Sequence, residues 1–252
     1  MNVPVMLRPL FPKAVLRWVQ AFVLRYGVLI ASPILYIDPP PFSDAIGGNY
    51  VRNCALDLVS REIEGRDVPG AVAELGVFRG DFAALLNRLF PDRTLYLFDT
   101  FTGFQEEDIL AEQVRDERGV YGTRSRVDVG GFCKTSVDIV MKKMAHPEKC
   151  VIKRGVFPET TLGLEDVNFA FCSIDVDLFQ PTISGLEFFY RRLSPGGYLF
   201  LHDYNNGHYR GVRAALQQFC AREEISFFPL PDTGGTAVIS KPLPKGGPLL
   251  SY

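Results

Sequence analysis

Apolar residues form two alternating patterns along the chain. Short continuous runs that end at a polar residue or a glycine predict buried strands. These runs cover 72–75, 95–99, 150–155, 167–174 and 198–201. Stretches with helical spacing predict helices over 50–64, 82–89, 135–144, 181–192 and 211–222. Such alternation favours an α/β fold with a doubly wound, mostly parallel sheet in one domain.

The end of the chain predicts a different local structure. The runs 226–230 and 236–240 are joined by a polar, glycine-containing turn, which indicates a closing β-hairpin and a sheet of seven strands. In contrast, residues 105–129 are charged and have little apolar pattern. We interpret that stretch as a long excursion over the active site.

The N-terminal stretch is apolar but does not predict a membrane span. Arg17 and Arg25 interrupt it, and its longest uncharged run, 26–37, is too short to cross a bilayer. We expect this stretch to form an amphipathic helix that packs on the main domain or on a second subunit. A homo-oligomer is therefore possible. Binding of the helix to a membrane surface is less favoured. The predicted parts are a helix and proline-rich linker over 1–49, a main domain over 50–241 and a disordered tail over 242–252.

Composition narrows the partners and the compartment. The 252 residues have a net charge of −2, which does not indicate a nucleic-acid partner. The five cysteines are odd in number, widely spaced and without a Cys-x-x-Cys pair. That usage is typical of a reduced, cytoplasmic protein without a structural zinc site.

The first predicted strand leads into a glycine turn and a helix start. Gly76 and Gly80 allow the backbone to approach a ligand, and the helix behind them offers free N–H groups. Their Gly-x-x-x-Gly spacing lacks the middle glycine of a dinucleotide fingerprint. Glu74, just before the turn, would repel a pyrophosphate but suits a cation such as an amino-acid ammonium.

The second predicted strand ends in Asp99, where a carboxylate can accept hydrogen bonds from a ribose diol. An ammonium near Glu74 and a ribose near Asp99 describe S-adenosylmethionine better than a nicotinamide cofactor, so an oxidoreductase is disfavoured. Val77, Thr100 and Ser136, the last at a predicted helix start, complete the proposed cofactor-binding residues, together with Asp175 described next.

The later strands also end in carboxylates. Asp175 and Asp177 follow one strand and Asp203 follows the next. Since the carboxyl ends of parallel strands meet at one edge, Asp175 and Asp203 could share a hard divalent cation such as Mg²⁺. Such an ion would lower the pKa of a substrate hydroxyl. Alternatively, these acids cap helices or pair with nearby arginines, Arg210 and Arg213.

Several segments together resemble the macrocin O-methyltransferase family, over about residues 50–219. They are 74–83, 95–104, 174–182, 193–197 and 203–204. The resemblance implies a class I, Rossmann-like methyltransferase that uses S-adenosylmethionine, generally with magnesium, on sugar hydroxyls of natural products. It also implies that Glu74, Gly76 and Gly80 line the methionine end of the cofactor, that Asp99 holds the ribose, and that Asp175 binds the metal and can act as the base.

One departure from the family concerns the metal. The family usually has Asp-Asp-Tyr where this chain has His202-Asp203-Tyr204. Histidine favours manganese, zinc or iron over magnesium, and it could instead serve as a general base. We therefore predict Asp175, His202 and Asp203 as metal ligands, and Asp175 and His202 as catalytic residues.

The predicted function is a metal-assisted O-methyltransferase acting on a hydroxyl of a sugar or a related natural product or polysaccharide. The acceptor is thus a small molecule or a glycan. The alternative is a metal-independent or non-catalytic protein that binds S-adenosylmethionine with the same fold.

Overall fold

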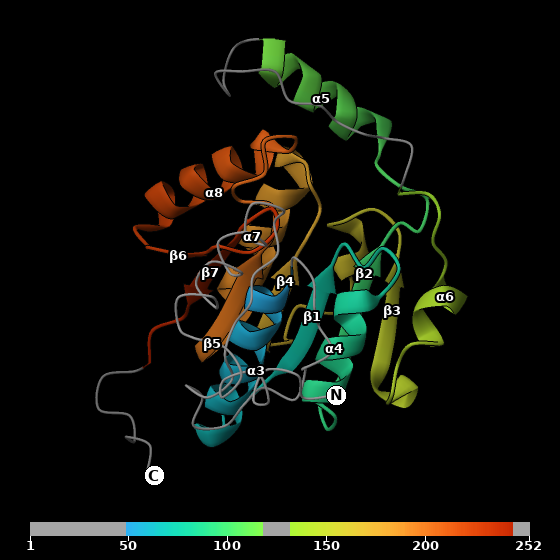
Figure 1. Ribbon diagram of the computed structural model, residues 1–252, viewed down its shortest axis with the longest axis vertical. Coiled ribbons are helices and arrows are strands. Elements are labelled where there is room, and N and C mark those ends of the chain that lie inside the picture. The colour runs from blue at the N-terminus through green and yellow to red at the C-terminus, as the bar shows by residue number, and fades with distance from the viewer. Residues whose placement is uncertain (1–48, 118–131, 244–252) are drawn as a thin grey trace, which may run out of the picture. The chain divides into compact units, whose positions relative to one another are not determined.

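The computed structural model describes residues 49–117 and 132–243 (Figure 1). The chain divides into two compact units, Met1–Leu58 and Val59–Tyr252. The described part of the first unit is 49–58, which begins helix α3 (Tyr50–Gly65). The predicted N-terminal amphipathic helix and tail residues 244–252 lie outside the described residues.

Among the described residues, no helix is both long and apolar enough to cross a bilayer. All five cysteines are free thiols.

A single seven-stranded sheet forms the centre of the second unit (Figure 1). Its spatial order is β3-β2-β1-β4-β5-β7-β6, with β1 to β5 parallel, β7 antiparallel to β5, and β6 antiparallel to β7. The predicted mostly parallel sheet and its closing hairpin are therefore confirmed. The strands are β1 (Ala71–Leu75), β2 (Leu95–Asp99), β3 (Cys150–Arg154), β4 (Phe169–Ile174), β5 (Leu193–Leu201), β6 (Phe228–Leu230) and β7 (Thr236–Ser240).

Helices cover both faces of this sheet, as a doubly wound fold requires. Helix α4 lies on one face, and α7 and α8 pack together on the other (Figure 1). Gly185 lets α7 approach closely, since a Cβ there would lie 2.8 Å from the side chain of Leu75. The helices are α4 (Asp81–Leu89), α5 (Glu106–Glu117), α6 (Val137–Met141), α7 (Phe179–Arg192) and α8 (Arg210–Glu223), with short 3₁₀ helices at Pro147–Lys149 and Glu159–Thr161.

The core is densest beneath α7. Every residue of β4 is buried, which explains its continuous apolar sequence. Phe189 of α7 meets Phe98 and Phe169 of the sheet edge to face, with ring centroids 5.7 and 5.3 Å apart. This packing fixes α7, and with it the strand ends that flank it, in a single arrangement.

The interpretation of 105–129 as a loop is wrong over its first half. Residues 106–117 form α5, and residues 118–131 lie outside the described part. Polar groups attach this helix to the start of α7. Glu112 is only 1% exposed and accepts a hydrogen bond from the Phe179 amide at 3.0 Å, while the Arg115 guanidinium lies 3.5 Å from the centre of the Phe179 ring. A helix held by charged side chains leaves no apolar stripe in the sequence.

Two further boundaries differ from expectation. The helix predicted over 135–144 ends at Met141, because Asn87 of α4 binds both the amide and the carbonyl of His146 and draws the chain away. The strand predicted from Tyr198 already begins at Leu193, which pairs with Phe169. Pairing with β4 thus extends β5 through residues 194–197, whose sequence indicates a turn.

Candidate active site

The site lies where the order of the parallel strands reverses along the chain. β1 has β2 on one side and β4 on the other, so ligands are expected at the carboxyl ends of these strands. The strand pairing continues past the last residues: the Asp175 amide donates to Leu75 O at 2.8 Å, and the His202 amide donates to Ile174 O at 2.9 Å. The ends of β1, β4 and β5 therefore present their next side chains side by side.

The two glycines of the first turn are required by the packing of the chain itself. Gly76 has φ +87°, and a Cβ on it would lie 1.9 Å from the carbonyl oxygen of Asp175. Gly80 has φ +77°, and its Cβ would meet Val140 of α6 at 3.0 Å. The sequence attributes these glycines to ligand approach, whereas the structure gives an internal reason for each.

Asp99 is held by backbone donors from two loops. Its Oδ2 accepts from the Phe78 amide at 2.8 Å, and its Oδ1 accepts from the Phe101 amide at 2.7 Å. Burial raises the pKa of Asp99, and the backbone hydrogen bonds oppose that rise in part. The carboxyl group is half-buried, so it is fixed in direction and still accessible to a ligand.

The other predicted cofactor residues lie in β1, in the turn after it, directly after β2 and at the start of α6. Glu74 is 2% exposed and Val77 3%. Thr100 donates its hydroxyl to Gly103 O at 2.8 Å, and the Ser136 hydroxyl accepts from the Ile139 amide at 3.3 Å as the N-cap of α6. The predicted cap is thus confirmed, and the cofactor contacts of these residues stay a prediction.

The three predicted metal ligands come together. The Nδ1 atom of His202 lies 3.2 Å from Asp175 Oδ1 and 3.4 Å from Asp203 Oδ1. One ligand atom from each residue can be chosen so that all lie within 4.8 Å of one another. Atoms this close can share one ion at bond lengths of about 2.0–2.4 Å. Two carboxylates and one imidazole thus fit a divalent cation.

The acids around this cluster differ in their affinity for protons. Burial acts to raise the pKa of Asp203, but hydrogen bonds from His202, Asp177 and Asn206, with the charge of His202, outweigh burial and lower the pKa to about 2. Burial raises the pKa of Asp177 well above its usual range, and hydrogen bonding to Asp203 and the charge of Asp175 add to the rise. These effects favour the protonated form of Asp177 and the ionised form of Asp203.

Three residues of this cluster were not assigned roles from the sequence. Asp177 has φ 62°, and its side chain interacts with that of Asp203. Asn206 donates to Asp203 Oδ1 at 2.8 Å, and Asp232 Oδ2 lies 3.9 Å from His202 Nε2. The Asp-x-Asp motif could have indicated Asp177. Asn206 and Asp232 lie in polar turns, where asparagine and aspartate are expected without any ligand.

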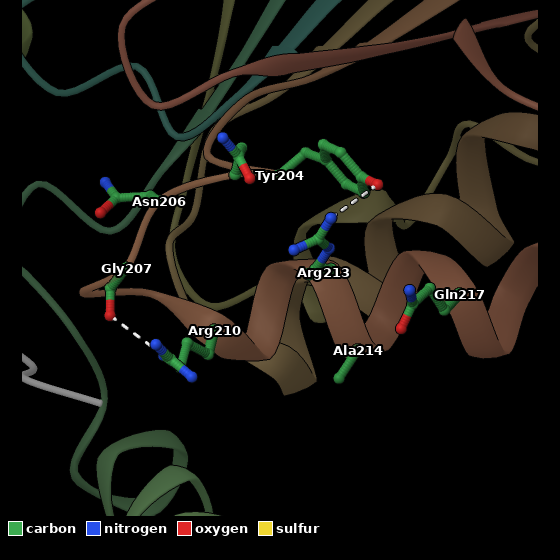
Figure 2. A pocket seen from close by; sticks show the side chains of 8 residues that line it. Tyr204, Asn206, Gly207, Arg210, Arg213, Ala214 and Gln217 are labelled. Carbon is green, nitrogen blue, oxygen red and sulfur yellow. Dashed lines mark hydrogen bonds between the residues drawn. The ribbon is translucent and has the colours of Figure 1, made fainter. Parts of the chain in front are cut away.

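A polar pocket of about 280 Å³ lies beside the cluster. Figure 2 shows the residues that line this pocket. Asn206 connects the two, since it binds Asp203 and also lines the pocket. The Arg213 guanidinium donates to the Tyr204 hydroxyl at 3.2 Å, and Arg210 donates to Gly207 O at 3.3 Å. The lining residues are Tyr204, Asn205, Asn206, Gly207, Arg210, Arg213, Ala214 and Gln217.

Solved structures share this fold. The O-methyltransferase NovP superimposes with a TM-score of 0.60 at 21% identity, covering 78% of this chain and 81% of NovP. The calicheamicin methyltransferase CalS11 has a TM-score of 0.56 at 18% identity, covering 85% and 95% of the two chains. The expected α/β fold class is therefore confirmed.

Characterised relatives are similar in sequence. Mycinamicin III 3''-O-methyltransferase of Micromonospora griseorubida is 28% identical over 168 residues, which is 63% of each chain. The 8-demethyl-8-(2,3-dimethoxy-alpha-L-rhamnosyl)-tetracenomycin-C 4'-O-methyltransferase of Streptomyces olivaceus is 27% identical over 180 residues, which is 68% of this chain and 65% of that protein. The chain thus aligns with somewhat less than two thirds of each relative.

The model of one family matches most of the chain. It is the macrocin O-methyltransferase (TylF) family, and its match covers residues 37–239. That range includes the strands of the sheet up to Ile239 and all the predicted cofactor-binding and metal-binding residues. The chain belongs to the macrocin O-methyltransferase family.

Proposed function

We propose that the protein is an S-adenosylmethionine-dependent O-methyltransferase that uses a divalent cation and acts on a hydroxyl of a sugar-type acceptor. The observation that carries the proposal is the position of two different sites at the same edge of the sheet, on the two sides of the end of β1. Asp99 lies at the end of β2, and the cluster of Asp175, His202 and Asp203 follows β4 and β5. Between these sites a methyl donor and a hydroxyl acceptor can meet.

When bound, S-adenosylmethionine supplies an activated methyl group, and a divalent cation supplies positive charge that lowers the pKa of an acceptor hydroxyl. Asp99 would accept hydrogen bonds from the ribose, and Glu74 would attract the ammonium group of the cofactor. Asp175 and His202 lie at the cation cluster, where either can take the proton that the acceptor hydroxyl loses. The chain contributes orientation and charge, because the methyl donor is already reactive.

The polar pocket beside the cluster is the proposed acceptor site. Its lining carries amide, hydroxyl and guanidinium groups, which suit the many hydroxyls of a sugar. Asn206 would place the acceptor relative to the cluster, because it contacts both. The sugar O-methyltransferases among the relatives act on natural products, which supports this class of acceptor.

A second candidate is a methyltransferase that works without a metal. The distance of 3.2 Å between His202 Nδ1 and Asp175 Oδ1 favours it, since a histidine oriented by a carboxylate is a common general base. In that case His202 would remove the acceptor proton alone.

Titration calorimetry on metal-stripped protein tests both candidates. We expect S-adenosylhomocysteine to bind, and Mn²⁺ or Mg²⁺ to bind in a way that Asp175→Ala abolishes. Cofactor binding without metal binding would favour the second candidate. An absence of cofactor binding would contradict both.

A further inference from the structure

The polar pocket beside the cation cluster has positive charge on one wall. That wall is the beginning of α8, from which Arg210, Arg213, Ala214 and Gln217 line the pocket. These positions are three or four residues apart, so they form one stripe along the helix. The opposite side of α8 is buried in the core. Figure 2 shows both guanidinium groups at this wall.

The other wall of the pocket is the segment 204–207, and it carries no charge. Its residues are Tyr204, Asn205, Asn206 and Gly207, so none of the eight lining residues is acidic. A Cβ on Gly207 would have nothing within 4 Å, which shows that the chain leaves room on this side. The lining as a whole therefore carries two positive charges and no negative one.

The guanidinium of Arg213 is held in place and keeps its capacity to bind. Its Nη2 donates to the Tyr204 hydroxyl at 3.2 Å, and its central carbon lies 4.8 Å from the centre of the Tyr204 ring. The ring itself packs against Phe227 at 4.9 Å. A guanidinium has five N–H donors, so one hydrogen bond to a neutral hydroxyl leaves the charge and most of the donors for a ligand.

The position of the two arginines does not serve the stability of α8. Positive charges in the first turn of a helix oppose its dipole, and like charges three positions apart repel each other. The first turn of α8 contains no acidic residue of its own. The carboxylate of Glu112 lies against Gly211, on the buried side of this turn, and leaves no room for a Cβ there. The chain thus supplies an anion to the buried side, whereas the pocket side presents the arginines.

We propose that the acceptor carries a phosphoryl group and that Arg210 and Arg213 bind it. The proposal rests on the proposed function and narrows its acceptor to a sugar phosphate or a sugar linked through a diphosphate. Two guanidinium groups on one stripe can each reach a different oxygen of a tetrahedral, doubly charged group. A carboxylate is planar and is matched by the fork of a single guanidinium.

This arrangement also sets the direction in which the acceptor lies. Asn206 donates to Asp203 Oδ1 at 2.8 Å and lines the pocket, so it stands between the cation cluster and the arginines. The acids of the cluster repel a phosphoryl group, and the arginines attract it. The phosphoryl group therefore lies at α8, and a hydroxyl of the sugar points toward the cluster. The pocket volume of about 280 Å³ suits one sugar unit.

The alternative is that both arginines are ordinary surface charges. In that case a phosphoryl compound would bind weakly and would respond equally to the loss of any exposed arginine. Arg191 is the matched control, because it is exposed and belongs to the last turn of α7. That turn precedes β5 and so lies at the edge of the sheet opposite to the pocket.

The experiment uses full-length protein saturated with S-adenosylhomocysteine, which fills the cofactor site. Divalent cations are left out because they bind phosphate themselves. Titration calorimetry compares glucose 1-phosphate and UDP-glucose with glucuronate and methyl glucoside. We expect the two phosphoryl probes to bind at least about 10-fold more tightly than the other two. The tighter of the two phosphoryl probes identifies a monoester or a diphosphate as the source of the group.

Three variants assign the binding to the arginines. Arg213→Gln should raise the Kd of the phosphoryl probes by about 10- to 100-fold and leave the Kd of methyl glucoside unchanged. Arg210→Gln should weaken the phosphoryl probes in the same way, and Arg191→Gln should have no effect. Thermal melting checks that each variant folds.

Four outcomes would overturn the proposal: no binding of either phosphoryl probe, equal affinity for glucuronate and glucose 1-phosphate, no effect of Arg213→Gln, or an equal effect of Arg191→Gln. None of them touches the methyltransferase proposal, which stands if the same preparations bind S-adenosylhomocysteine and, in a separate titration, Mn²⁺. If wild type does not bind S-adenosylhomocysteine, the proposed function fails and the phosphoryl proposal fails with it.

Discussion

The two halves of the candidate active site are built differently. The cofactor half, at the ends of β1 and β2, consists of short motifs in which each strand carries its own polar residue. The cation half combines the end of β4, the end of β5 and the turn before β7. Local sequence is enough to indicate the first half, whereas the second depends on which strands become neighbours.

The same contrast appears in the electrostatics. Asp99 is fixed by backbone amides, and burial still raises its pKa. Asp203 is surrounded by side-chain donors, which lower its pKa to about 2 despite burial. The cation half thus holds a firmly ionised carboxylate, as a metal ligand requires, and the cofactor half holds one suited to accept neutral hydroxyl donors.

The largest expected effect is a loss of stability at the contact between the two halves, where Gly76 lies against Asp175. We expect Gly76→Ala to destabilise the protein by about 3 kcal/mol or more, since the new Cβ would meet a backbone oxygen at 1.9 Å and φ is positive. Gly163→Ala is the matched control: φ is +80° but nothing lies within 4 Å, so about 1 kcal/mol is expected. Urea denaturation measures both, and equal losses would contradict the packing argument.

The second largest effect should be a loss of metal binding that leaves cofactor binding unchanged. Asp203→Asn removes an ionised ligand, and we expect the Kd for Mn²⁺ to rise by at least about 100-fold. The affinity for S-adenosylhomocysteine should change little, because Asp203 does not belong to the proposed cofactor half. Calorimetry of both ligands makes the test, and a parallel loss of cofactor affinity would show that the halves are not independent.

The converse variant is Asp99→Asn. Loss of a charged hydrogen bond to the ribose should weaken binding of S-adenosylhomocysteine by about 10- to 100-fold while Mn²⁺ binding is retained. Asparagine keeps one of the two oxygens that accept the Phe78 and Phe101 amides. Unchanged cofactor affinity would remove Asp99 from the site.

The smallest effect concerns pH. Because burial raises the pKa of Asp99, this group should take up its proton at a higher pH than an ordinary aspartate as the solution is acidified. Affinity for S-adenosylhomocysteine should therefore decline from neutral toward mildly acidic pH. Calorimetry across that range should show a weaker decline for Asp99→Asn, and an identical decline in both proteins would assign it to another group.

The sequence predicts most of the fold and the grouping of Asp175, His202 and Asp203. Apolar runs that end in Glu74, Asp99, Asp175 and Asp203 indicate where parallel strands finish, and the hairpin follows from its glycine turn. It does not predict α5, whose attachment through Glu112 and Arg115 is polar.

It also does not predict the environment of His202. Asp232 is 30 positions further along the chain, and only the pairing of β5 with β7 brings it to the ring. Asp177 is visible in the sequence, but the rise in its pKa depends on burial beside Asp203. Contacts between turns that are far apart in the sequence leave no periodic pattern of apolar residues, so the sequence does not indicate them.

The most direct measurement is a crystal structure with S-adenosylhomocysteine and Mn²⁺, with anomalous data collected at the manganese edge. The account predicts the ribose at Asp99 and one anomalous peak bounded by Asp175, Asp203 and Nδ1 of His202. A cofactor bound elsewhere, or a manganese peak away from these three side chains, would contradict it.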